Sequence, residues 1–243
     1  VLPLFLHKNS SKFTQMREIF PTSLFATVNV MFFILGVSLT TANISIVIYA
    51  AVPLLISIIM YLLFKKRLSR NTEIGVVIGF VGGLLITLLP LFEKGNPFAG
   101  NLLGNMLLAI AVVSWSCYMV FSKKLQEKYS PFMITTNFIF VSLLALFPFF
   151  LWDIYTHYGW WENVSGWGFF SVFYMGIMIT IVGYILHQYA IKHGGSVFAG
   201  TTFYVGPVLG VIINYLLLGE LLTLGFVVGS ILALLGTALV IRK

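Results

Sequence analysis

Hydrophobic residues fill eight long stretches of the sequence, and polar residues are concentrated in the short segments between them. Each stretch has about 20 residues, which is the length that an α-helix needs to cross a hydrocarbon core of about 30 Å. The pattern therefore predicts an all-α polytopic membrane protein. The expected helices cover residues 19–38, 42–64, 73–91, 101–121, 131–152, 167–190, 196–218 and 221–241.

The composition agrees with this prediction. The 243 residues are 59% hydrophobic and 9% charged, whereas about a quarter of the residues in a soluble domain are charged. Residues 1–6 are apolar but too short to span a membrane, so we expect them to be the tail of a truncated helix. The single cysteine, Cys117, excludes an internal disulfide.

Basic residues are confined almost entirely to alternate connections. Segments 7–18, 65–72 and 122–130, together with Lys192 and the final two residues, hold 13 of the 14 Lys and Arg residues. The positive-inside rule makes these connections cytoplasmic. We therefore expect a multi-pass protein of the cytoplasmic (plasma) membrane with a cytoplasmic C-terminus. Topology explains the net charge of +7, so no nucleic-acid partner is expected.

The chain also contains an internal repeat with an offset of 154 residues. Pro53 matches Pro207, Tyr61 matches Tyr215, and two glycine pairs continue the match. The first copy ends in FKKRLS and the second in LLLGELLT, so the terminal charge is reversed. Because the period corresponds to five helices, an odd number, the second copy must enter the membrane in the opposite sense. Inverted repeats of this kind are typical of secondary transporters.

These residues resemble the EamA-type transporters of the drug/metabolite transporter superfamily. The resemblance is carried by the two proline segments, by the glycine pairs Gly75/Gly229 and Gly82/Gly236, and by Ser114-Trp115-Ser116. It implies ten helices in two inverted five-helix repeats, a central cavity between the two halves, and transport of small metabolites, often by export. Lys66 stands where this family often has a glutamate that matches Glu220.

The resemblance and the repeat together divide the chain into two parts. Residues 1–98 are expected to form a first repeat that lacks its first helix and most of its second, and residues 99–243 a complete second repeat. About eight complete transmembrane helices would then be present.

Prolines and glycines are the first candidate functional residues. Pro53 and Pro207 lie in the middle of expected helices, where a proline removes one backbone hydrogen bond. We expect them to act as hinges beside the cavity, with simple helix bending as the alternative. Small residues let helices pack closely in lipid. The expected packing glycines are Gly75, Gly79, Gly82, Gly229 and Gly236.

Polar and aromatic residues inside the expected helices are the candidates for substrate binding, because such residues tend to face the interior of a bundle. An aromatic lining with hydrogen-bonding groups suits small amphipathic solutes. The predicted substrate-binding residues are Tyr49, Trp115, Tyr118, Tyr184, Tyr204 and Asn214. His187 lies five residues before Lys192, so an interfacial position is expected, with a role in proton coupling as the alternative.

Three other functions were weighed against secondary transport. No ATP-binding GxxxxGK[ST] segment is present, and the four histidines are scattered, so neither ATP-driven transport nor a membrane enzyme is expected. A non-transporting scaffold or receptor remains the alternative function. No cofactor or metal is expected. The predicted partners are a small-molecule substrate and the lipid bilayer, and a homodimer is compatible with the sequence.

Overall fold

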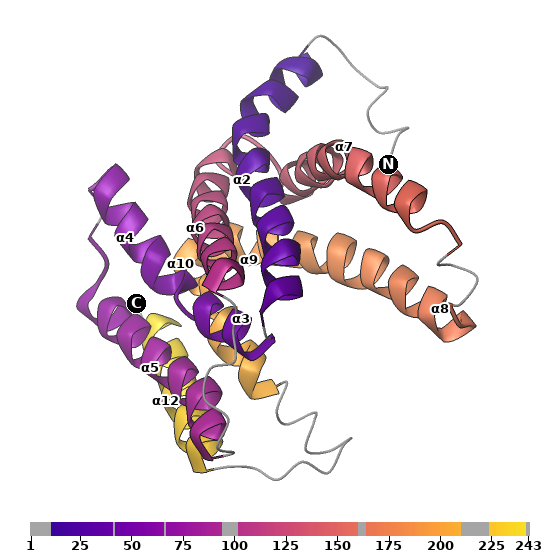
Figure 1. Ribbon diagram of the computed structural model, residues 1–243. Coiled ribbons are helices and arrows are strands. Elements are labelled where there is room, and N and C mark those ends of the chain that lie inside the picture. The colour runs from indigo at the N-terminus through magenta and orange to yellow at the C-terminus, as the bar shows by residue number, and fades with distance from the viewer. Residues whose placement is uncertain are drawn as a thin grey trace.

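The computed structural model describes residues 11–40, 42–65, 67–93, 102–159, 164–209 and 224–241. Throughout these ranges the regular structure is helical (Figure 1). The elements are α2 (Ser11–Leu39), α3 (Ala42–Tyr49), α4 (Val52–Phe64), α5 (Arg70–Glu93), α6 (Leu102–Leu125), α7 (Pro131–Thr156), α8 (Gly166–Tyr174), the π-helix η2 (Met175–Gly183), α9 (Tyr184–Gly194), α10 (Ser196–Gly200) and α12 (Leu224–Ile241). Residues 202–209 are also helical.

Four continuous helical segments in the described ranges are long and apolar enough to cross a membrane. They are Thr14–Leu39, Leu102–Leu125, Pro131–Thr156 and Gly166–Gly194. Each coincides with one of the helices expected from the sequence. Shorter apolar helices cover Val52–Phe64, Ser196–Leu209 and Val227–Val240. The chain therefore has the all-helical, apolar construction of a polytopic membrane protein.

Two of the expected helices are interrupted. The helix expected over 42–64 is divided into α3 and α4 by a turn at Ala50 and Ala51, directly before Pro53. Pro53 has no amide hydrogen to continue the ladder of the preceding turn, so the break lies where the sequence places it. Thr201 makes a second turn between α10 and residues 202–209.

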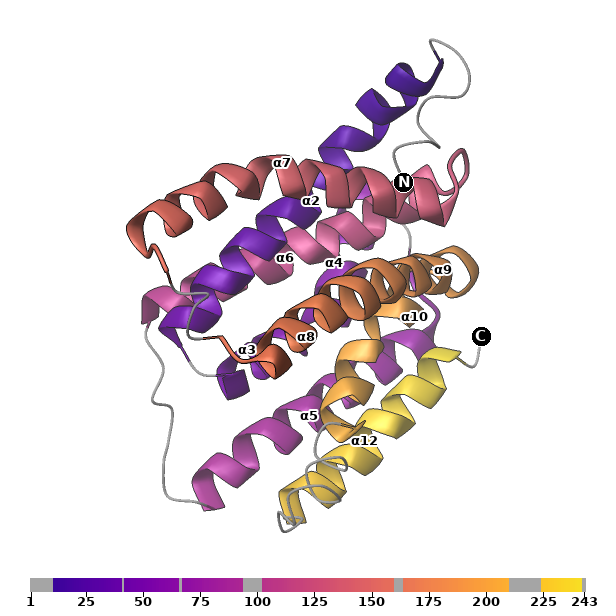
Figure 2. The same ribbon diagram turned by 90° about the vertical axis from the view of Figure 1, so that its right-hand side faces the viewer.

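Helix α2 lies against both α6 and α7, as the two ribbon views show (Figures 1 and 2). Polar side chains join these helices at several depths. Ser23 donates a hydrogen bond of 2.7 Å to the Asn137 side chain, and the hydroxyls of Thr27 and Ser142 lie 2.8 Å apart. Bonds of this kind between membrane helices contribute about 0.6 kcal/mol each. They fix the register of α2 against α7.

Helices α5 and α12 form a separate close pair (Figure 2). Their contact is built from glycines: a Cβ placed on Gly75 would lie 2.7 Å from the carbonyl oxygen of Gly236, and one on Gly82 would lie 2.7 Å from that of Gly229. Backbones that approach so closely leave no room for a side chain. The pair is therefore held by direct backbone contact, as small-residue interfaces in membranes are.

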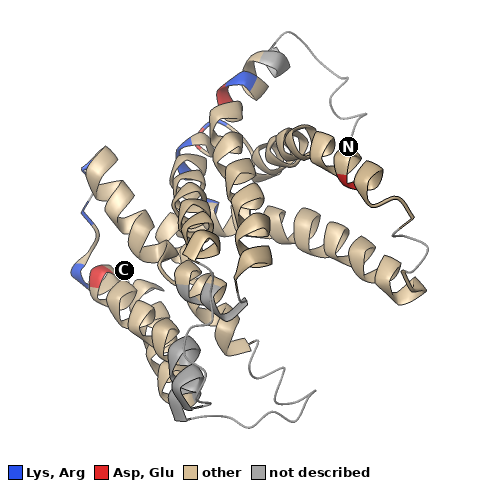
Figure 3. Ribbon diagram, viewed as in Figure 1, with Lys and Arg blue, Asp and Glu red and all other residues tan. Residues whose placement is uncertain are grey.

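Charged residues lie at helix ends and in connections, while the middles of the helices are uncharged in the described chain (Figure 3). Three contacts bring four helix ends together. Tyr129, after α6, donates to Glu18 in α2 at 2.7 Å; Lys124 lies over the Phe64 ring of α4; and Lys123 donates to the carbonyl of Lys192 in α9. The start of α2 and the ends of α4, α6 and α9 thus meet at one end of the molecule, which we call the basic end.

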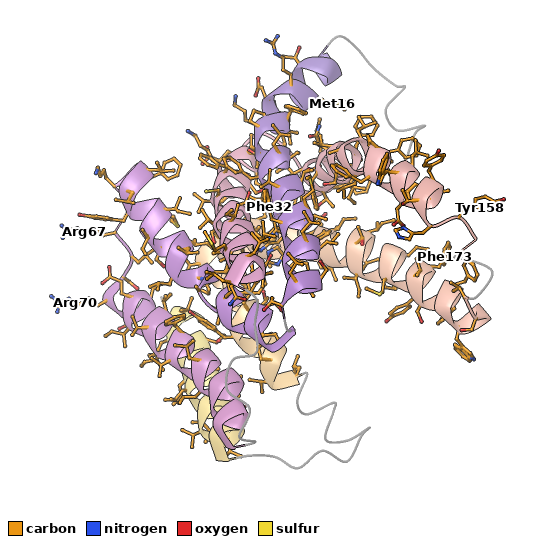
Figure 4. The ribbon with its side chains drawn as sticks, in the orientation of Figure 1. Met16, Phe32, Arg67, Arg70, Tyr158 and Phe173 are labelled. Carbon is orange, nitrogen blue, oxygen red and sulfur yellow. The ribbon has the colours of Figure 1, made fainter. Side chains whose placement is uncertain are left out.

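The Tyr129 hydrogen bond illustrates the electrostatics of this end. Donation to the Glu18 carboxylate stabilises the protonated phenol and raises the pKa of Tyr129 above its ordinary value. Arg67 and Arg70 project outward at this end, whereas Tyr158 lies at the opposite side of the molecule (Figure 4). The separation of charge expected from the sequence is therefore present in the fold.

Candidate functional site

Five aromatic side chains gather where α6, α7 and α9 meet. The Trp115 ring lies 5.1 Å from Tyr118, 5.8 Å from Tyr184 and 5.6 Å from His187, measured between centroids. Phe138 lies 5.6 Å from Tyr118 and 5.0 Å from Tyr184. Trp115 and Tyr118 are three residues apart on α6, as are Tyr184 and His187 on α9, so each pair shares one helix face. We call these five residues the Trp115 cluster.

A cavity of about 540 Å³, open to the surface where Leu143, Phe147 and Phe150 are exposed, adjoins the Trp115 cluster and shares two of its walls, Phe138 and Tyr184. It lies between α2, α7 and the η2–α9 helix. Its volume is in the range of small-molecule sites, and a mostly apolar lining with a few polar groups is typical of them. The lining residues are Val30, Phe138, Ile139, Ser142, Leu143, Leu146, Phe147, Phe150, Thr180 and Tyr184.

Two polar atoms of the Trp115 cluster are buried without a hydrogen bond to any described residue. They are Nε1 of Trp115 and Nε2 of His187. An unpaired buried polar atom costs about 1–3 kcal/mol, so most such atoms in proteins find a partner. The cluster therefore has hydrogen-bonding capacity that these helices leave unused.

Several other polar groups beside the cluster are bonded to one another. Gln188 donates to the Tyr118 hydroxyl at 2.7 Å and to Ser122 at 3.1 Å. Gln126 donates to the Gln188 side-chain oxygen at 2.6 Å and to its backbone oxygen at 2.9 Å. This network joins α6 to α9 and holds the Tyr118 ring in place on the side of the cluster toward the basic end.

Tyr49 belongs to an adjoining part of the same hydrophobic core. Asn29 donates to the Tyr49 hydroxyl at 2.6 Å and to the backbone oxygen of Ala111 at 2.9 Å, which ties α2 to both α3 and α6. The Tyr49 ring packs against Phe33 and Phe203, with centroids 5.4 and 5.5 Å away.

Tyr204 is placed apart from the other predicted substrate-binding residues. Its side chain is completely buried, and its hydroxyl donates to the backbone oxygen of Val76 in α5 at 2.9 Å. Its ring fills the space beside Gly79, where no Cβ would fit. The structure thus brings together Trp115, Tyr118 and Tyr184, places Tyr49 next to them, and uses Tyr204 to pack α5. Asn214 lies outside the described residues.

Three participants in this region were missed or differently placed by sequence reasoning. Phe138 is 1% exposed and central to the cluster; the spacing of Ile134, Phe138 and Val141 on one face of α7 was the signal that could have found it. His187 was expected at the interface, but its ring packs on Trp115. Gln126 carried no signal, since it follows the expected end of its helix.

Both predicted hinge prolines lie close to helix breaks. Pro53 is buried in the first turn of α4, and Pro207 lies six residues beyond the turn at Thr201. The glycines Gly75, Gly79, Gly82, Gly229 and Gly236 are all buried. All five lie along the contact between α5 and α12, where Gly79 faces Gly236 and also meets the Tyr204 ring.

Comparison with known proteins decides the family. The sequence profile described as the EamA-like transporter family matches residues 1–88 and 102–242. The chain belongs to the EamA-like transporter family. The resemblance seen in the sequence is thereby confirmed, and the family places the chain among multi-pass membrane transporters rather than enzymes.

Individual relatives agree with the EamA assignment. An uncharacterized transporter of Archaeoglobus fulgidus is 28% identical over 96% of this chain and 80% of its own length. An uncharacterized transporter of Clostridium kluyveri is 27% identical over 73% of this chain, which spans only 56% of that relative. A WAT1-related protein of Arabidopsis thaliana is 26% identical over 84% of this chain and 63% of its own length.

A solved crystal structure has the same fold. It superposes with a TM-score of 0.75 at 18% sequence identity, covering 93% of this chain and 77% of that chain. At this identity the likeness concerns the fold alone, so the substrate has to be argued from the site itself.

Proposed function

We propose that this EamA-family transporter is a secondary transporter that moves a small organic solute across the plasma membrane by alternating access, with export as the favoured direction. The observation that carries the proposal is the Trp115 cluster beside its cavity, which combines aromatic walls with unused hydrogen-bonding atoms. Tyr49 and Asn29 extend the same region toward α2 and α3. The unpaired nitrogens of Trp115 and His187 offer hydrogen bonds that a solute can complete.

The positions of the helices support two repeated halves. Adding the 154-residue offset to the first residues of α3 and α5, Ala42 and Arg70, gives Ser196 and Leu224, the first residues of α10 and α12. The same offset carries α2 onto the segment from α8 to α9, within one residue at each end. The family profile also matches in two parts. We therefore propose repeats over residues 1–98 and 99–243 within a ten-helix protein.

The directions of these helices support the inversion. Helix α2 begins at the basic end, where Glu18 meets Tyr129, whereas its repeat partner finishes there, where Lys123 meets Lys192. Equivalent helices thus run in opposite directions. Inverted halves that enclose a site between them are the usual construction of alternating-access transporters.

The orientation follows from the charges. Because cytoplasmic connections of membrane proteins carry the excess of Lys and Arg, the basic end is assigned to the cytoplasm. The opposite end, where α7 finishes and α8 begins, is then outside. In this assignment the C-terminus is cytoplasmic. Export from the cytoplasm rests on the family resemblance.

The test is untargeted metabolite release from cells that make the protein, compared with cells that make Trp115→Ala at the same level in the membrane. We expect at least one solute to accumulate outside only with the unchanged protein. A parallel uptake assay covers the reverse direction. No solute difference in either direction, with both proteins folded and in the membrane, would contradict transport that depends on Trp115. No difference from cells that lack the protein would favour the scaffold or receptor.

A further inference from the structure

The Trp115 indole restricts what a ligand must present. Its ring is 4% exposed, and Nε1 has no partner among the described residues. An indole nitrogen can only donate a hydrogen bond. A ligand group that satisfies it must therefore be an acceptor, such as a carbonyl or ether oxygen. The neighbouring Nε2 of His187 is also unpaired and can donate or accept, depending on the tautomer.

Tyr184 connects this polar position to the cavity. Its ring lines the cavity and also lies 5.8 Å from Trp115. Its hydroxyl makes no hydrogen bond within the described chain, so no bond has to be broken for this side chain to move. A ligand whose apolar part fills the cavity could then reach Trp115 and His187 with a polar end on the far side of Tyr184.

The charge distribution restricts the ligand further. Among the described residues, no charged side chain lines the cavity or belongs to the Trp115 cluster. The charged residues of the described chain lie instead at helix ends (Figure 3). An ionised group at membrane depth is costly unless it has a partner of opposite charge. An uncharged ligand needs no such partner.

We infer that the Trp115 cluster binds an uncharged, largely apolar solute with a hydrogen-bond acceptor at one end. The acceptor is bonded by Nε1–H of Trp115, with His187 beside it, and the apolar body lies in the cavity against Phe138, Phe147 and Tyr184. This inference rests on the proposed function, since it names the substrate class of the same site.

The experiment uses the purified protein in lipid nanodiscs and three probes that share one ring system: 2-naphthamide, 2-naphthoate and 2-methylnaphthalene. Calorimetric titrations give the Kd values, and empty nanodiscs correct for partitioning into lipid. We expect the uncharged amide to bind at least tenfold more tightly than the carboxylate. Trp115→Phe keeps an aromatic side chain, though a smaller one, and removes the N–H, so it should weaken amide binding about tenfold, the usual effect of losing one buried hydrogen bond.

Trp167→Phe is the matched control, because Trp167 is exposed at the start of α8. Trp167→Phe should leave all three Kd values unchanged. Trp115→Phe should likewise leave the Kd of the hydrocarbon, 2-methylnaphthalene, unchanged. Tighter binding of the carboxylate, an unchanged amide Kd in Trp115→Phe, or no binding by any probe would overturn the inference. Solute flux is measured separately. Flux that persists in Trp115→Phe would support the proposed transport but contradict this ligand class. Probe binding without flux would support the ligand site but contradict transport.

Discussion

Tyr49 and Tyr204 have similar sequence surroundings, but their hydroxyls have different hydrogen-bond partners in the structure. Tyr49 and Tyr204 each lie within a turn of a proline, and both were expected in the cavity. The Tyr49 hydroxyl accepts from Asn29 inside the central core, whereas the Tyr204 hydroxyl donates to the Val76 carbonyl in α5. A backbone carbonyl oxygen has two lone pairs, so the Val76 oxygen can accept the Tyr204 hydrogen bond in addition to a helical one. The Tyr204 hydroxyl thus joins two elements, and the role of this residue in substrate binding stays a prediction.

Tyr204→Phe should accordingly affect stability more than transport. Loss of its hydrogen bond is expected to lower the free energy of unfolding by about 0.5–1.5 kcal/mol, with the solute affinity unchanged. Thermal unfolding in detergent and initial flux rates measure the two effects. Tyr189→Phe, on the exposed face of α9, is the control. A loss of flux at unchanged unfolding temperature would return Tyr204 to the substrate site.

Sequence reasoning succeeded with individual residues where chemistry alone was sufficient. Trp115, Tyr118 and Tyr184 combine aromatic surface with a polar atom inside apolar helices, and such residues tend to face the interior. Sequence reasoning did not predict which way His187 faces. Its position was judged by the distance along the helix from Lys192, and that distance does not say that the ring packs on Trp115. The interfacial position of His187 stays a prediction.

At the scale of elements, the α5–α12 pair leaves little room for larger side chains at its glycines. Gly82→Val would place a Cβ 2.7 Å from the carbonyl oxygen of Gly229, and overpacking of this kind costs about 1–3 kcal/mol. We expect a lower unfolding temperature. Gly176→Val is the control, because nothing lies within 4 Å of a Cβ there. Equal effects of the two substitutions would contradict the close contact.

The break between α3 and α4 offers a different test. Pro53→Ala restores an amide hydrogen and lets the helix continue through Ala50 and Ala51. If this break flexes during transport, the variant should turn over several-fold more slowly with little change in solute affinity or stability, and Pro207→Ala should behave similarly. Pro131→Ala is the control, since Pro131 opens α7, where a proline removes no helical bond. Unchanged turnover in both hinge variants would refute the hinge.

Most helices could be predicted because length and hydropathy determine them. The division at Pro53 followed from the missing amide. The π-helix η2 was not predicted. Met175–Gly183 contains no proline, and its one hydroxyl residue, Thr180, gave no signal in the sequence. In the structure the Thr180 hydroxyl donates to the backbone oxygen of Met175, five residues earlier, at 3.3 Å.

At the scale of the whole molecule, the orientation can be tested with introduced cysteines. In a Cys117→Ser background, Lys124→Cys lies at the basic end and Tyr155→Cys near the end of α7. A membrane-impermeant maleimide added to intact cells should label Tyr155→Cys at once and Lys124→Cys only after permeabilisation, because the basic end is assigned to the cytoplasm. The reverse labelling pattern would invert the proposed topology.

The π-helix has a consequence for the molecule as a whole. Helix α2 is α-helical throughout, whereas its proposed repeat partner inserts η2 between α8 and α9. The two halves therefore differ in the length and rotation of a central helix. In a transporter of identical halves, exchanging their shapes would give two facing states of equal energy. In the proposed alternating-access mechanism this exchange is unequal, so we expect one facing state to be favoured at rest and the empty protein to be open mainly to one side of the membrane.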